Sequence, residues 1–146
     1  MVLLHRHMKA VDFVIELDDR MLYLEIKDPE HPKARAHQQS AAFVTGFLAA
    51  DKDDELVRKF RDSLLYEWAC EEVHKPIHYW VIVAIERLAA PELSSRSDDL
   101  KRKLPVVDAL PQRWKRRIVE DCRVFNIRSW NEALPEGYRL ERVKTP

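Results

Sequence analysis

Asp12, Glu25 and Lys27 are charged residues placed within two otherwise apolar stretches, VDFVIELDDRMLYLEIKDP at residues 11–29. Alternating apolar residues on either side of a pair of aspartates predict two strands joined by a tight turn. A two-residue loop would pair positions whose numbers sum to 37, so that Asp12 lies opposite Glu25. Two carboxylates placed directly opposite each other repel, unless a cation lies between them or one of them is protonated.

Lys27 follows Glu25 by two residues and therefore projects from the same face of the predicted strand. A metal cation between the two carboxylates would remove their mutual repulsion. The alternative is a solvent-exposed face on which Lys27 neutralises the two carboxylates. The predicted hairpin, followed by a helix and an apolar strand, favours the metal site.

The rest of the chain predicts the elements that would support this hairpin. We expect helices at about 34–50 and from about 53 to 73, a central strand at 77–88, an irregular helical segment at 89–121, a strand at 122–129, a short helix at SWNEAL capped by Ser129 and Glu132, and an edge strand at 137–143. This order predicts an α/β (α+β) fold with a mixed central sheet, in which helices flank a catalytic β-hairpin.

Asp12 in AVDFVIE, together with Glu25 and Lys27 in YLEIKD, resembles the PD-(D/E)XK nuclease superfamily. The resemblance covers about residues 8–87 and implies a restriction-endonuclease-like fold. It implies that Asp12, Glu25 and the backbone carbonyl of Ile26 bind Mg²⁺, for which Mn²⁺ can substitute. It also implies that Lys27 orients or helps to deprotonate the attacking water and neutralises the scissile phosphate.

Some members of this superfamily add a glutamine in the next helix, with an aromatic residue four positions later. Gln39 and Phe43 match that pattern, although a different register would put Gln38 in the place of Gln39. Gln39 is therefore a further candidate catalytic residue, which would position the nucleophile or a phosphate.

The resemblance implies a metal-dependent nuclease that hydrolyses phosphodiester bonds, in DNA rather than in RNA. Two alternatives stay open: a catalytically inactive nuclease-fold module that binds nucleic acid or a partner protein, and a small structural or interaction protein. An enzyme with one site per chain commonly cuts two strands with two chains, so a homodimer is compatible with this function.

The net charge of zero hides an asymmetry along the chain. Residues 1–95 carry 12 Lys+Arg and 17 Asp+Glu, whereas residues 96–146 carry 13 and 8. The candidate nucleic-acid-binding residues in this basic part are Lys101, Arg102, Lys103, Arg113, Lys115, Arg116 and Arg117. Trp114 among them is a candidate for contact with a base or the backbone. The alternative is a solvated helix face.

Composition excludes several other classes. With 146 residues, 46% of them apolar and 34% charged, the chain predicts one globular domain over residues 1–146, with its core at about 8–87 and a basic α/β tail at about 96–146. No apolar run approaches the roughly 20 residues that span a bilayer, so no membrane partner is expected. Two cysteines without a CxxC spacing predict reduced thiols in a cytoplasmic protein. Two glycines are too few for a phosphate-cradling loop.

Overall fold

A four-stranded mixed sheet forms the centre of the fold in a computed structural model that describes residues 8–33, 39–104, 115 and 117–143. The strands lie in the order β1 (Phe13–Glu16), β2 (Met21–Lys27), β3 (Ile77–Val83) and β4 (Val119–Phe125). β1 is antiparallel to β2, whereas β2, β3 and β4 are parallel to one another. The predicted α/β class with a mixed sheet is confirmed.

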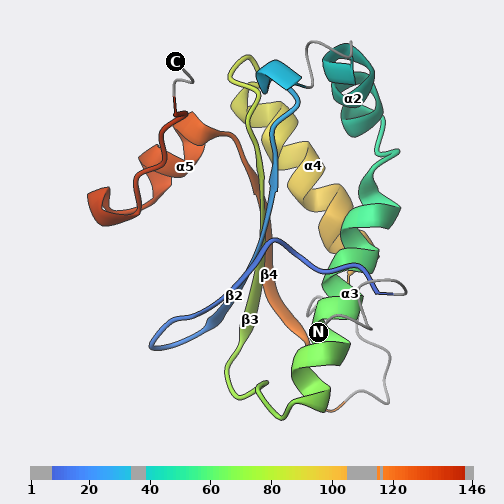
Figure 1. Cartoon of the computed structure of the whole chain (residues 1–146), viewed down its shortest axis with the longest axis vertical. Helices are drawn as coiled ribbons and strands as arrows, with labels where there is room; N and C mark the ends of the chain where they lie inside the picture. Colours follow the sequence, from blue (N-terminus) through green and yellow to red (C-terminus); the bar gives the residue numbers. More distant parts are fainter. Residues whose placement is uncertain (1–7, 34–38, 105–114, 116, 144–146) are drawn as a thin grey trace.

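Helices lie on both faces of this sheet (Figure 1). Their bounds are α2 Gln39–Leu48, α3 Asp53–Ala69, α4 Ala90–Lys103 and α5 Ile127–Ala133, followed by the short 3₁₀ helix η2 at Glu136–Tyr138. α3 and α4 connect the parallel strands and cover one face, and α5 covers part of the other (Figure 1). The predicted basic tail is part of the same sheet, because β4 pairs with β3.

The main hydrophobic core lies between the sheet and the layer of α3 and α4. Tyr23, Phe60 and Tyr79 are fully buried there, and the ring of Phe60 packs against the other two, with centroids 5.6 and 5.3 Å away. A smaller apolar cluster on the opposite face includes Trp80 and Trp130, whose rings meet edge to face at 5.6 Å between centroids. Both faces of the central strands are therefore buried, as the apolar sequence of β3 indicates.

The hairpin has the predicted register. Phe13 pairs with Leu24 and Glu16 pairs with Met21, so that the paired numbers sum to 37. Leu17 N–H donates to Arg20 O at 2.8 Å and closes a two-residue loop. Alternation in sequence and turn composition were sufficient to fix which residues of the two strands face each other.

Apolar alternation alone would predict that the apolar face of the hairpin is buried and that the other face is exposed. The burial in the structure differs from this expectation. Phe13 and Ile15 of the apolar face are 52% and 37% exposed, because β1 is an edge strand that α5 does not cover. The face that carries Tyr23 and Glu25 lies under α3, and both residues are completely buried. Glu25 is thus a charged residue of the interior, which requires partners for its carboxylate.

Several predicted element bounds were wrong. α3 ends at Ala69 rather than near residue 73, since Glu71 takes the left-handed conformation (φ 60°) that terminates helices. The strand predicted at 122–129 begins at Val119 and ends at Phe125. α5 is capped by Asn126, whose Oδ1 accepts from Ser129 N–H at 2.9 Å, rather than by Ser129.

The strand predicted at 137–143 is not formed. Leu140 N–H donates to Asn131 Oδ1 and Leu140 O accepts from Asn131 Nδ2, each at 2.8 Å. The backbone groups that would pair in a strand are therefore satisfied by a side chain of α5. Alternation in that segment reflects packing of Leu140 on the smaller apolar cluster.

A buried ion pair joins the layer of helices. Asp53, at the start of α3, is completely buried and accepts from Arg96 Nη2 of α4 and, at 2.9 Å, from Lys103 Nζ. Arg96 is itself 2% exposed, and its guanidinium lies 5.3 Å from the ring centroid of Phe47 in α2. This pairing fixes the start of α3 relative to α4.

No helix in the described part of the chain is long and apolar enough to cross a membrane.

Candidate functional site

Glu25 is at the centre of a group of charged side chains beneath α3. Its Oε1 accepts from Lys59 Nζ at 2.5 Å and lies 3.1 Å from Lys27 Nζ. Its Oε2 is buried and has no hydrogen-bond partner among the described residues. Burying an acceptor without a partner costs free energy, so Oε2 is the atom of this carboxylate whose burial is not compensated by a described residue.

Asp12 lies at the solvent side of the same group. Its Oδ2 accepts from the backbone N–H of Ile26 at 2.7 Å, which places its carboxylate against β2 beside Glu25. Asp12 precedes the first residue of β1, so it binds the edge of the β2 backbone instead of belonging to the strand ladder. The preceding residue is held to α3, because Val11 N–H donates to Ser63 Oγ at 2.9 Å.

α3 contributes two charged residues that the sequence analysis did not identify. Glu55 Oε1 lies 3.6 Å from Lys27 Nζ, and Lys59 contacts Glu25 as described above. Glu55 and Lys59 are four residues apart and adjoin the buried positions Leu56 and Phe60. The sequence pattern that could have indicated these contacts is two charged residues four positions apart on a helix, each next to a buried apolar residue.

The electrostatics of the group favour the charged forms of Lys27 and Glu55. Burial lowers the pKa of Lys27, but Glu25, Glu55 and Asp12 together outweigh it, and the pKa is raised from its ordinary value. Burial raises the pKa of Glu55, but Lys27, Lys9 and Lys59 outweigh it, and the pKa is lowered. Lys27 is therefore a cation held between carboxylates from a strand and a helix.

Two carboxylates of this group are candidate oxygen ligands for a hard divalent cation: that of Glu25, whose Oε2 has no described partner, and that of Asp12, which accepts from Ile26 N–H. In the described residues there is no group of three or more His, Cys, Asp or Glu side chains that could hold a metal ion. A backbone carbonyl such as that of Ile26, and water, would have to complete the coordination.

The other predicted site residues lie further out or outside the described part. Gln39 is the first residue of α2, but its side chain and all of Gln38 lie outside the described residues, as do Arg113, Trp114 and Arg116. The basic residues with ion-pair partners are Lys101 with Asp121 (3.6 Å), Arg102 with Asp99, Lys103 with Asp53 (2.9 Å) and Arg117 with Glu120 (3.2 Å). Lys115 is exposed.

Comparisons of the chain with protein-family models, with curated proteins and with solved structures find no match.

Proposed function

We propose that the protein is a metal-dependent nuclease that hydrolyses phosphodiester bonds, in DNA rather than RNA. The observation that carries the proposal is the completely buried Glu25 carboxylate, which has one oxygen without a partner and the other in contact with Lys27. A buried carboxylate with an unused acceptor, next to a second carboxylate and a lysine, supplies oxygen ligands for a cation and a positive group for a phosphate.

Asp12, Glu25 and the backbone carbonyl of Ile26 would hold Mg²⁺. When bound, the ion would lower the pKa of a water molecule and stabilise negative charge on the phosphate. Lys27 would orient that water and the scissile phosphate through its ammonium group. Glu25 and, to a lesser extent, Glu55 raise the pKa of Lys27, and Glu55 contacts its Nζ from α3.

The basic segment at the end of α4 supports a nucleic-acid substrate. Lys103 contacts Asp53, and Asp53 and Glu55 both belong to the first turn of α3. Lys103, at the end of α4, therefore adjoins the first turn of α3, whose Glu55 contacts Lys27. Lysine and arginine side chains bind the nucleic-acid backbone through its phosphates.

Cleavage assays with metal ions test this function. We expect the protein to cut DNA in Mg²⁺ or Mn²⁺, to lose all activity in EDTA, and to lose most activity when Asp12→Asn weakens the ligand set. Asp18→Asn, an exposed residue of the hairpin turn, is the matched control and should cut normally. Parallel assays on RNA test the substrate preference. Absence of cleavage with either ion, on either nucleic acid, would contradict the proposal.

A second candidate is a nuclease-fold module that binds nucleic acid or a partner protein without cutting it. It is favoured by the pairing of Glu25 with two lysines, which neutralises the carboxylate without a metal ion. Salt-dependent DNA binding in the absence of cleavage under any metal ion would select this candidate.

Lys59→Gln distinguishes a metal site from a purely structural ion cluster. If a metal ion binds Glu25, Lys59 competes with it electrostatically, and the substitution should tighten Mn²⁺ binding about tenfold, which corresponds to about 1.4 kcal/mol. The same change should lower the free energy of unfolding without metal, because Glu25 loses one of its two cations. Isothermal titration calorimetry and urea denaturation measure the two effects.

Lys75→Gln is the control for this prediction, because Lys75 pairs with Glu16, whose side chain is 62% exposed. The Mn²⁺ affinity of the Lys75→Gln variant should equal that of the unmodified protein. An unchanged Mn²⁺ affinity in Lys59→Gln would indicate that the cluster is structural.

A further inference from the structure

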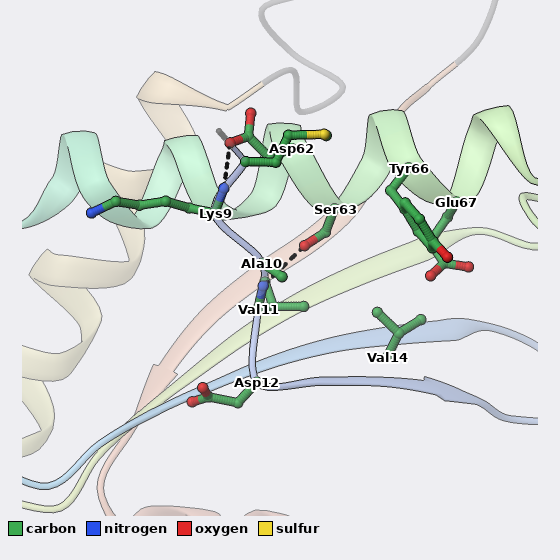
Figure 2. Close-up of a pocket in the computed structure, with 10 residues that line it drawn as sticks. Lys9, Ala10, Val11, Asp12, Val14, Asp62, Ser63, Tyr66 and Glu67 are labelled. Atoms are coloured by element: carbon green, nitrogen blue, oxygen red, sulfur yellow. Dashed lines mark hydrogen bonds between the residues drawn. The ribbon is translucent and has the colours of Figure 1, made fainter. Parts of the chain in front are cut away.

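A cavity of about 230 Å³ lies between the segment that leads into β1 and the second half of α3 (Figure 2). Its walls are held in place by two hydrogen bonds across the gap: Lys9 N–H to Asp62 Oδ2 at 2.7 Å and Val11 N–H to Ser63 Oγ at 2.9 Å. Asp12 is part of its lining, so the cavity adjoins the candidate metal site. The cavity therefore has walls fixed by hydrogen bonds, and it lies beside the proposed reaction centre.

The lining is suited to a flat ring with an amino group. Val11 and Val14 supply apolar walls, and the aromatic ring of Tyr66 points from α3 toward Val14, with Glu67 next to it (Figure 2). The cavity is smaller than the roughly 300–1,000 Å³ of sites for drug-sized ligands, so it fits one ring system rather than a whole nucleotide. Aromatic rings such as Tyr66 bind nucleobases by stacking.

Two carboxylates line the cavity, and they favour a ring that carries a hydrogen-bond donor. Asp62 already accepts from Lys9 N–H and lies 3.7 Å from Arg58 Nε, so Glu67 is the carboxylate that we assign to an exocyclic amine. Burial, with a contribution from Glu72, raises the pKa of Glu67, as expected for a carboxylate partly shielded from water.

We propose that this cavity binds one unstacked base with an exocyclic amine, cytosine or adenine, from a nucleotide next to the phosphate that the proposed metal ion and Lys27 would hold. Tyr66 stacks on the base and Glu67 accepts from its amine. This inference rests on the proposed nuclease function and specifies its substrate: a single strand, or a duplex opened at the cut. Unstacking a base from an intact duplex costs free energy, so unpaired sites are preferred.

Binding assays in EDTA test the base site separately from cleavage. The probe is a labelled single-stranded DNA oligonucleotide, followed by fluorescence anisotropy, in a series that moves one abasic nucleotide along the strand. We expect one abasic position to weaken binding to the unmodified protein about tenfold, since stacking on an aromatic residue is lost. In Tyr66→Ala the same position should have no effect, whereas Tyr66→Phe should behave like the unmodified protein.

Trp68→Ala is the matched control, because Trp68 is an aromatic residue of the same helix that is 67% exposed and does not line the cavity. It should keep the position-dependent loss. At the sensitive position, uracil in place of cytosine should weaken binding to the unmodified protein, and Glu67→Gln should reverse that preference, because an amide can donate to the uracil O4.

The possible outcomes distinguish the proposed base site from the proposed nuclease function. Equal losses at every abasic position, the same losses in Tyr66→Ala as in the unmodified protein, or no oligonucleotide binding at all would overturn the base site. Cleavage in Mg²⁺ without any abasic effect would leave the nuclease standing and remove the base site. The predicted abasic effect without cleavage under any metal ion would support the base site and remove the nuclease.

Discussion

Lys27→Ala is expected to lower the rate of phosphodiester cleavage by about 10²–10⁴-fold, the usual contribution of a positioned acid–base group. The Lys27 ammonium lies 3.1 Å from Glu25 Oε1 and 3.6 Å from Glu55 Oε1, so its position is fixed by carboxylates from two elements. Alanine removes the group that would orient the water and the phosphate, and no other described cation contacts both carboxylates. Single-turnover cleavage of labelled DNA in Mg²⁺ measures the effect.

The folded state should survive this substitution, which separates a catalytic loss from unfolding. Lys59 still neutralises Glu25 in Lys27→Ala, so circular dichroism should show a folded protein at room temperature. Lys27→Arg keeps the charge and should retain more activity than alanine. Lys75→Ala removes a lysine that pairs with exposed Glu16 and should cut at the normal rate. Normal cleavage by Lys27→Ala would remove the catalytic role assigned to this lysine.

The hairpin shows how much of the fold was predictable from the sequence. Its register follows from local information, namely alternation on both arms and two aspartates at the turn, and the structure has the same pairs. The start of β3 was also recognisable, because IHYWVIV is apolar on both faces, but the predicted strand ran to residue 88 and β3 ends at Val83. The segment at 137–143 has similar alternation, but its backbone bonds go to Asn131, a tertiary contact that no local pattern reveals.

The candidate site was predictable only where it depends on the hairpin. Pairing rules placed Asp12 near Glu25, and the strand period placed Lys27 on the same face as Glu25. Neither rule reveals that α3 covers this face, so that Glu25 becomes completely buried. The contributions of Glu55 and Lys59 depend on the packing of α3 on the sheet, which is a long-range property of the fold.

Arg96→Ala is expected to lower the free energy of unfolding by about 3–5 kcal/mol, the usual cost of removing one partner of a buried ion pair. Arg96 and Asp53 are 2% and 0% exposed, so alanine leaves the Asp53 carboxylate in the interior. Lys103 still contacts Asp53 at 2.9 Å, but its side chain is 43% exposed and offsets only part of the loss. Urea denaturation at neutral pH measures the change.

Arg102→Ala is the control on the same helix, because Arg102 pairs with Asp99 at the surface and its side chain is 70% exposed. Its substitution should change the free energy of unfolding by no more than about 1 kcal/mol. Equal losses in the two variants would contradict the assignment of Arg96 as a buried structural residue.

The double substitution Arg96→Met with Asp53→Leu tests whether the Arg96–Asp53 ion pair stabilises the folded protein or fixes the position of α3. Replacing both charges with apolar groups removes the buried carboxylate, so stability should return to about that of the unmodified protein or exceed it. Asp53 begins the helix that carries Glu55 and Lys59, so loss of the pair frees the start of α3 to shift. We therefore expect this variant to be fully folded and yet to cleave DNA more slowly, because Lys27 loses its fixed partner on α3. A folded double variant with normal cleavage would show that packing alone positions α3 over Glu25.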